Sequence, residues 1–170
     1  MAEPHEVLNG LPADEARAAL ARCCGAARWV NGMMKRRPFA SSGDLHAAAD
    51  EIFATLGEDD LREAFAHHPR IGANVDELRA RFAATSAWAG AEQAGAVGAD
   101  EAVLEALRAG NLAYEQRFGF LFIVCATGKS AAEMLALLRA RLSNRPEVEL
   151  PLAAAEQAKI THLRLEKLRP

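Results

Sequence analysis

Long apolar segments are missing from this 170-residue sequence. No run of about 18 apolar residues is present, and the N-terminal residues do not have the pattern of a signal peptide, so we expect a soluble, cytoplasmic protein. An excess of basic residues is missing too, because the formal net charge is −3. This charge argues against nucleic acid or an anionic membrane as the main partner, and we expect the protein to bind neither.

Cysteine is scarce, since Cys23, Cys24 and Cys125 are the three that occur. An odd number of cysteines without metal-ligand spacing favours reduced side chains that serve as packing residues. No pair of histidines or cysteines has the spacing of zinc ligands either, because His67 and His68 are adjacent and their side chains diverge. We therefore expect no metal site.

Signatures of nucleotide cofactors are also missing. The segment ATGKS, residues 126–130, resembles the end of a phosphate-binding loop, but that loop requires glycine at position 123, which is Ile123. No glycine-rich dinucleotide fingerprint occurs. The sequence thus gives no reason to expect a bound nucleotide.

Strand patterns are almost absent, and most of the chain consists of helix-forming segments that end at glycine or proline. The pattern predicts helices over about 12–25, 41–57, 58–68, 76–95, 99–119, 130–144 and 151–170, with a shorter one around Trp29. Ser130 and Glu133 form a possible capping box. The one strand-like run is FLFIVCA, residues 120–126. We predict a single all-α domain over residues 1–170, a bundle of about seven to nine helices with one short extended segment near 120–126.

The stretch AHHPRIGA, residues 66–73, interrupts this helical material. Proline disfavours the α conformation in the residue before it, so His68 should lie where a helix ends and His67 in its last turn. The partial negative charge of a helix C-terminus favours a protonated imidazole, and imidazole can act as a general acid–base near neutral pH. A plain helix stop with two exposed histidines is the simpler alternative.

Two further segments carry polar groups suited to a site. AEQ, residues 91–93, places a carboxylate that could orient an imidazole beside an amide that could bind a carbonyl or ureido group. EQRFGF, residues 115–120, places Arg117 at a helix end, where its planar guanidinium could bind an oxyanion or a carbonyl. A solvated helix face and a helix-end ion pair are the simpler alternatives.

These segments together resemble one family in their order and spacing. They are RRPF (36–39), AFAHHPRIG (64–72), EQAG (92–95), NLAYEQRFGFLFIVCATGKS (111–130) and LRLEKL (163–168). The family is the 2-oxo-4-hydroxy-4-carboxy-5-ureidoimidazoline (OHCU) decarboxylases of urate breakdown, and the resemblance covers essentially the whole chain. It implies an all-helical, cofactor-free homodimer that converts OHCU to (S)-allantoin and releases CO2.

The resemblance also implies roles for particular residues. It assigns catalysis to His68, as a general acid–base, and to Glu92, which would orient it or hold its charge. It assigns substrate binding to a second set, namely Pro69, Gln93, Arg117, Phe122, Ile123 and Val124. The substrate's own imine and carbonyl groups could accept the electron pair that decarboxylation leaves, so neither a cofactor nor a metal would be required.

Two positions depart from the family pattern. Ala89 stands where the family commonly has serine, which removes a hydroxyl expected to bind the substrate, and Leu121 stands where proline is frequent. Ala89 keeps open an alternative, a decarboxylase or binding protein for a different ureide or a related enzyme that acts on hydroxyisourate, the compound preceding OHCU. A non-catalytic helical scaffold is the other alternative.

The homodimer is expected mainly from the resemblance. Trp29, Trp88 and the leucine-rich C-terminal helix, with Leu163, Leu165 and Leu168, could add an apolar contact surface.

Overall fold

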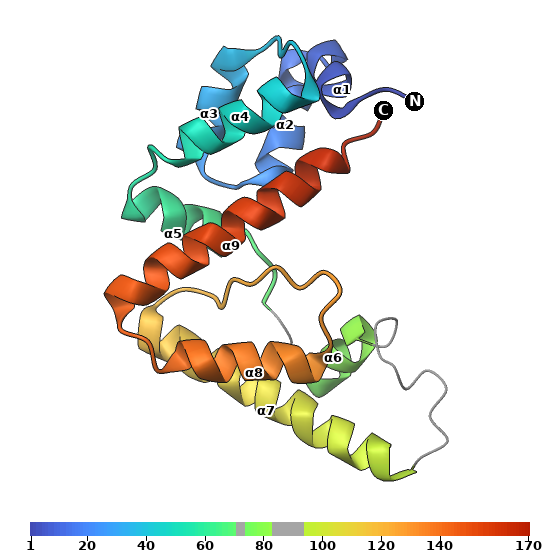
Figure 1. Ribbon diagram of the computed structural model, residues 1–170, viewed down its shortest axis with the longest axis vertical. Helices are drawn as coiled ribbons and strands as arrows, with labels where there is room; N and C mark the ends of the chain where they lie inside the picture. Colours follow the sequence, from blue (N-terminus) through green and yellow to red (C-terminus); the bar gives the residue numbers. More distant parts are fainter. Residues whose placement is uncertain (71–73, 83–93) are drawn as a thin grey trace. The chain divides into compact units, whose positions relative to one another are not determined.

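The computed structural model describes residues 1–70, 74–82 and 94–170, and every regular element in these ranges is a helix (Figure 1). The helices are α1 (Pro4–Gly10), α2 (Ala13–Cys23), α3 (Ala27–Arg36), α4 (Ser42–Phe53), α5 (Glu58–Ala66), α6 (Val75–Phe82), α7 (Ala94–Phe118), α8 (Ala131–Leu142) and α9 (Pro146–Glu166). The all-α fold and the expected number of helices are confirmed.

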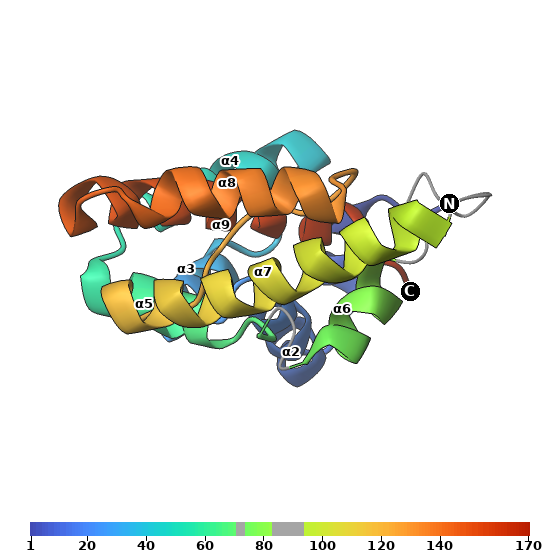
Figure 2. The ribbon, with the colours of Figure 1, turned by 90° about the horizontal axis from the view of Figure 1, so that it is seen from below.

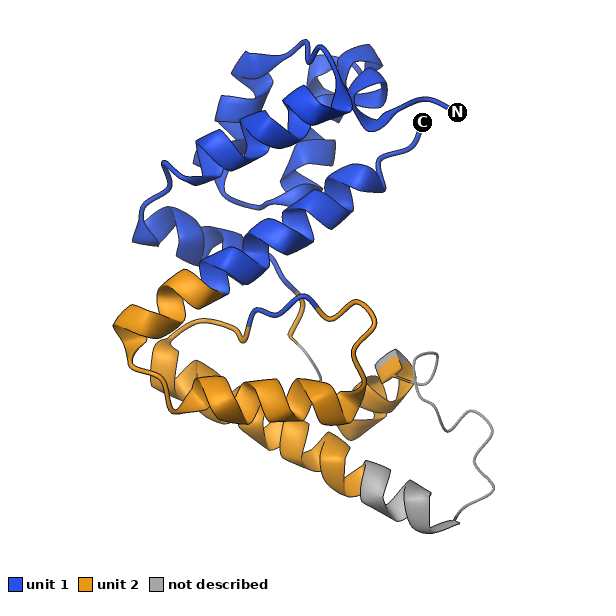
Figure 3. Ribbon diagram, viewed as in Figure 1, with its two compact units in different colours: residues 1–68, 123–125, 153–170 blue, residues 69–122, 126–152 orange. Residues whose placement is uncertain are grey.

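The chain forms two compact units, which Figure 3 shows in different colours. Unit 1 consists of Met1–His68, Ile123–Cys125 and Ala153–Pro170. Unit 2 consists of Pro69–Phe122 and Ala126–Leu152. A single domain over residues 1–170 stays a prediction.

Unit 1 has an apolar core to which α1, α2, α3 and α4 contribute, together with Leu165 of α9. Trp29 lies at its centre with no exposed surface, and its indole N–H donates to the carbonyl oxygen of Ala49 at 3.1 Å. The prediction that Trp29 and Leu165 form a dimer contact surface is therefore wrong, because both side chains are used up in the core. Trp88 lies outside the described residues.

The cysteines of unit 1 behave as packing residues. Cys23 and Cys24 are buried and free of disulfides, as predicted. Burial raises the pKa of the Cys23 thiol to about 11, so the thiol stays protonated at neutral pH.

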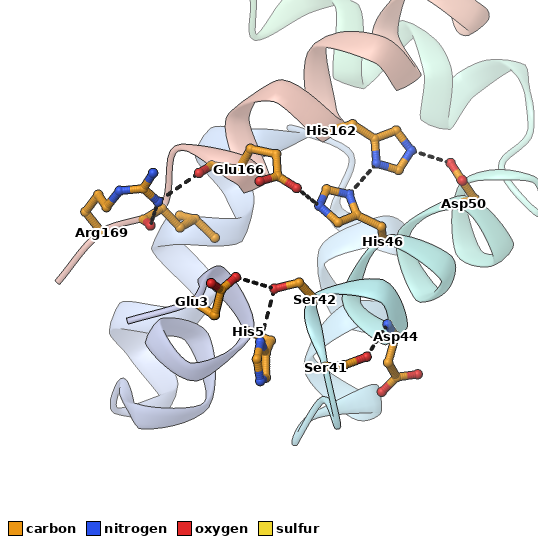
Figure 4. A network of polar contacts seen from close by, with 11 residues as sticks. Glu3, His5, Ser41, Ser42, Asp44, His46, Asp50, His162, Glu166 and Arg169 are labelled. Carbon is orange, nitrogen blue, oxygen red and sulfur yellow. Dashed lines mark hydrogen bonds and ion pairs between the residues drawn. The ribbon is translucent and has the colours of Figure 1, made fainter. Parts of the chain in front are cut away.

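The C-terminal half of α9 is joined to α4 by polar side chains (Figure 4). His46 and Asp50 lie one helical turn apart on α4, and His162 and Glu166 lie one turn apart on α9. Each histidine bonds the carboxylate of the other helix at 2.6 Å, which ties the two helices together at the surface of unit 1.

Unit 2 is built on α7, against which α6 and α8 pack (Figures 1 and 2). Gly110 lies inside α7, as the sequence predicts. A Cβ atom there would come within 2.6 Å of Leu138 Cδ2 on α8, so glycine allows the two helices to approach closely. This close contact compensates for the low helix propensity of glycine.

Two helices differ from the sequence-based prediction at their starts. The helix α1 was not predicted, although Pro4 at its first position and a bond from the Glu3 N–H to the Glu6 carboxylate at 2.8 Å stabilise it. The last helix begins at Pro146 rather than near Pro151, which lies inside it. Pro151 cannot donate a backbone hydrogen bond, and buried contacts of Glu149 hold this first part of α9 helical instead.

The strand-like segment has no strand structure. Residues 121–126 have neither helical nor ladder hydrogen bonds, although Phe122, Ile123 and Val124 are buried as an interior segment should be. A strand needs a neighbouring strand, and the described residues contain none. The segment is therefore held in place by burial of its apolar side chains and not by the hydrogen bonds of a sheet.

Candidate active site

His68 lies where the sequence predicts, just beyond a helix end. The helix α5 ends at Ala66, and His67 is its C-cap with φ −80° and ψ −7°, one residue past the last turn in which it was expected. The backbone N–H of His68 still donates to the carbonyl of Phe65 at 3.1 Å. Pro69 follows and prevents the helix from continuing.

The two histidines of this pair have different surroundings. The His67 side chain is exposed, and its Nδ1 bonds the carbonyl oxygen of Glu63 at 2.9 Å. A Cβ atom at Gly25 would overlap the His67 ring, so glycine at that position lets the ring lie against the chain. His68 instead is half-buried and turns toward α9. The simpler alternative, two exposed histidines at a helix stop, therefore fails for His68.

Both ring nitrogens of His68 have partners on α9. Nε2 lies 2.5 Å from Oε1 of Gln157, which is fully buried. Nδ1 lies 3.4 Å from Nη2 of Arg164, whose Nη1 donates to the carbonyl oxygen of Arg22 at 3.1 Å. The imidazole is thus held between an amide and a guanidinium.

These surroundings favour the neutral ring. Burial lowers the pKa of His68 below the ordinary 6.5, and the positive charges of Arg164 and His67 act in the same direction. The bond to Gln157 opposes them, but it is the smaller effect. The pKa of His68 is thus shifted in the direction opposite to that expected from the helix terminus, and His68 is available as a base at neutral pH.

The sequence alone did not identify the α9 side chains around His68. Gln157, Thr161 and Arg164 lie at positions i, i+4 and i+7 and therefore share one face of the helix. Thr161 accepts from the Gln157 amide at 3.0 Å and is almost fully buried. A row of polar residues at helical spacing was the available signal, but α9 carries many other charged residues, so this row does not stand out in the sequence.

Ile123 and Val124 also belong to unit 1 and are buried. Beyond them, the backbone N–H of Cys125 donates to Oε1 of Glu156 on α9 at 3.2 Å. Substrate binding by the N–H groups around residues 122–124 stays a prediction.

Pro69 and Arg117 belong to unit 2. Pro69 is exposed. Arg117, in the last turn of α7, donates to the carbonyl oxygen of Asn144 at 2.8 Å, and its guanidinium lies 5.2 Å from the centre of the Phe118 ring. Its bond is to a backbone carbonyl, not to a carboxylate, and the exposed guanidinium has further N–H groups that could bind an anionic or carbonyl oxygen.

A buried polar cluster supports the RFGF segment of unit 2. Glu149 has no exposed surface and accepts hydrogen bonds from the Tyr114 hydroxyl, from Arg141 Nε at 2.7 Å and from Asn144 Nδ2 at 3.0 Å. The Arg141 guanidinium lies 4.7 Å from the centre of the Phe122 ring. The cluster therefore contacts Phe122, two residues beyond the RFGF segment, and holds Asn144, the partner of Arg117.

Glycine and aromatic residues shape the same segment. Gly119 has φ 77°, a left-handed conformation that ends α7 and that glycine adopts without strain. Tyr114 then contacts the rings of Phe118, Phe120 and Phe122, with ring centres 4.6, 5.8 and 5.2 Å away. The RFGF motif is thus a helix end whose aromatic side chains fold back onto α7.

Three positions named from the sequence, Glu92, Gln93 and Ala89, lie outside the described residues. In the part of the chain that the structure describes, no three histidine, cysteine or acidic side chains form a group that could hold a metal ion. Within the same ranges, no helix is both long and apolar enough to cross a membrane.

Comparison with known proteins agrees with the resemblance. The family model described as OHCU decarboxylase matches residues 9–166. The chain is 40% identical over 159 residues to the uric acid degradation bifunctional protein TTL of Arabidopsis thaliana, and the match covers 86% of this chain and 45% of that protein. It is 34% identical over 133 residues to the 2-oxo-4-hydroxy-4-carboxy-5-ureidoimidazoline decarboxylase of Amia calva, covering 78% of this chain and 74% of the relative.

Solved structures give the same picture. A crystal structure of OHCU decarboxylase in the presence of (S)-allantoin matches with a TM-score of 0.68 and 35% identity, over 86% of this chain and 94% of that one. A crystal structure of (S)-allantoin synthase matches with a TM-score of 0.69 over 97% of this chain and 53% of that one, at 21% identity, which shows likeness of fold alone. The chain spans less than half the length of the Arabidopsis protein.

Proposed function

Because this chain belongs to the OHCU decarboxylase family, we propose that it is a carboxy-lyase of urate degradation that converts OHCU to (S)-allantoin and CO2. The observation that carries the proposal is the setting of His68. Its half-buried imidazole is held at two nitrogens, and burial lowers its pKa. A histidine with these properties is suited to proton transfer near neutral pH.

In this reaction His68 acts as the general acid–base. Glu92 orients the imidazole or holds the charge that it acquires. The bond between carbon and carboxylate breaks and leaves an electron pair, which the substrate's own imine and carbonyl groups accept, so the reaction proceeds without a cofactor or a metal ion. The protein fixes the ring, stabilises the developing anion and delivers a proton to one face.

The remaining site residues bind the substrate. Gln93 and the backbone N–H groups of Phe122, Ile123 and Val124 bind ureido and ring carbonyl oxygens, and Pro69 contacts the ring. Arg117 binds a substrate oxygen other than the leaving carboxylate, since pairing with that group would stabilise the ground state as much as the transition state.

A coupled assay tests the function. OHCU is made fresh from urate in the assay, and the optical activity of the allantoin is followed with and without this protein. We expect the appearance of (S)-allantoin to accelerate in proportion to the protein added. A rate equal to that of a heat-denatured sample would exclude the proposed activity.

One observation favours a second candidate, a decarboxylase or binding protein for a different ureide. Ala89 lacks the hydroxyl that the family commonly places there. The same assay with hydroxyisourate and with other ureides in place of OHCU distinguishes the two. A non-catalytic scaffold would show no turnover of any of them.

We also propose that the protein is a cytoplasmic homodimer. In unit 2 the apolar residues Leu112, Val148 and Leu152 are 47, 49 and 42% exposed. They offer apolar surface for a dimer contact, which the buried Trp29 cannot. Sedimentation at micromolar concentration should give a dimer, and a monomer alone would exclude this assembly.

A further inference from the structure

The buried side of His68 is connected to a chain of hydrogen bonds within unit 1. Oε1 of Gln157 lies 2.5 Å from His68 Nε2, and the amide nitrogen of Gln157 donates to Thr161 Oγ1 at 3.0 Å. The Thr161 hydroxyl in turn lies 3.2 Å from the carbonyl oxygen of Cys23 and 3.0 Å from that of Gln157. Gln157 has no exposed surface and Thr161 almost none.

The Thr161 hydroxyl supports the orientation of the Gln157 amide. A hydroxyl has one proton, and both carbonyl oxygens beside it can only accept. With the NH2 group of Gln157 facing Thr161, the hydroxyl accepts from it and keeps its proton for one of these carbonyls. This leaves the amide oxygen of Gln157 facing His68, so His68 Nε2 must carry a proton in order to donate to it.

The opposite side of the ring gives the same assignment independently. Arg164 Nη2 faces His68 Nδ1 at 3.4 Å, and a guanidinium is only a donor. A proton on Nδ1 would point at another N–H group and at a positive charge. The neutral ring therefore has its proton on Nε2 and its lone pair on Nδ1.

We propose that Gln157 is a positioning residue, which together with Arg164 holds the neutral His68 ring in the Nε2–H tautomer and fixes its orientation. This inference rests on the proposed function for the role of His68 as the base. When His68 takes up a proton in the reaction, the Nε2–H bond to Gln157 stabilises the positive charge on the ring. Thr161 acts through Gln157, because its hydroxyl accepts from the amide NH2 group and so keeps the amide oxygen toward the ring.

Substitutions at Gln157 separate positioning from a purely structural role. In Gln157→Leu the ring loses the bond that orients its Nε2–H side, and we expect kcat to fall by about tenfold or more, out of the ~10²–10⁴-fold that acid–base catalysis supplies. KM should change by less than about threefold, because Gln157 does not touch the substrate. Thr161→Val should lower kcat by a smaller factor, since the amide can then turn over.

The pH dependence of kcat/KM gives a signature with opposite signs for two variants. Arg164 and His67 are the charged or titratable groups that the described residues place near the ring. In Gln157→Glu a carboxylate stabilises the imidazolium, so the acid limb of the profile should move to higher pH than in the wild type. In Gln157→Leu the stabilising bond is lost, so the limb should move to lower pH. Limbs that stay at the wild-type position in both variants would overturn the proposal.

Nuclear magnetic resonance on the wild type tests the tautomer without any assay of activity. Two-bond 1H–15N correlations, with His68 assigned by its loss in His68→Gln, should show a protonated Nε2 and an unprotonated Nδ1 at pH 7.5. A proton on Nδ1 in an active enzyme would overturn the role of Gln157 and leave the proposed function intact. An inactive wild type would remove the proposed function, and with it this role. Glu15→Leu, at an exposed position of α2 outside every candidate site segment, is the control and should leave both the spectrum and kcat unchanged.

Discussion

His46 and His162 face each other through their Nδ1 atoms at 2.6 Å, with ring centres 4.9 Å apart (Figure 4). Their Nε2 atoms each lie 2.6 Å from a carboxylate oxygen, of Glu166 and Asp50 respectively. An ionised carboxylate only accepts, so both Nε2 atoms carry protons. The Nδ1 atoms contact each other, so the two rings and the two carboxylates form one chain of polar contacts between α4 and α9.

This contact predicts a measurable coupling between α4 and α9. A double-mutant cycle with His46→Ala and His162→Ala should give a coupling free energy of unfolding of about 1 kcal/mol, the size of one hydrogen bond at a partly exposed site. Urea unfolding of the four proteins measures it. The cycle repeated in an Asp50→Asn background should give a smaller value, because the carboxylate that orients the His162 ring is gone. Additive effects of the two alanine substitutions would show that the contact contributes nothing.

The two adjacent histidines should differ sharply in their effect on catalysis. We expect His68→Gln to lower kcat/KM by ~10²–10⁴-fold while its circular dichroism and melting temperature stay near the wild type. His67→Ala should change the rate by less than about threefold, because its ring is exposed and bonds only a backbone carbonyl. Steady-state kinetics with fresh OHCU measures both. The reverse ranking would transfer the catalytic role to His67.

Glu149 should be the most sensitive charged position for the stability of unit 2. Its carboxylate is fully buried against Arg141, and Glu149→Leu would leave that guanidinium buried without its counter-charge. Breaking one side of a buried ion pair costs about 3–5 kcal/mol, which urea unfolding would detect. Glu51→Leu is the control, since Glu51 pairs with Arg36 at the surface at 2.9 Å and should cost at most about 1 kcal/mol. Equal losses from the two substitutions would contradict the structural role of the buried pair.

Ala89→Ser should improve the enzyme on OHCU. If the family hydroxyl binds the substrate, one neutral hydrogen bond is worth ~0.5–1.5 kcal/mol, and kcat/KM should rise by about three- to tenfold. Serine is close to alanine in size and should cost only a few tenths of a kcal/mol if the position is helical. Kinetics on both proteins with fresh OHCU measure the change. A tenfold worse enzyme would instead mean that the site has adapted to the methyl group and favours a different ureide.

The sequence was sufficient to predict helix ends wherever a few neighbouring residues determine the backbone conformation. Pro69 ends a helix next to His68 because the proline ring excludes the α conformation from the preceding residue, and this holds whatever surrounds it. Ser130 and Glu133 form the predicted capping box, with the Glu133 N–H donating to Ser130 Oγ at 3.1 Å and the Ser130 N–H to the Glu133 carboxylate at 3.2 Å. Helix ends of this kind follow from steric exclusion and from bonds that span only three residues.

The surroundings of His68 were decided by tertiary structure alone. Gln157 lies 89 residues from His68 along the chain. The helical period shows which residues share a face of α9, but it does not show which other part of the chain packs against that face. The same holds for α9, which continues through Pro151 because Glu149 finds buried partners on other helices. Hydrogen bonds of buried polar groups are strong enough to override a local preference, but their partners are chosen by packing, and packing depends on the whole chain.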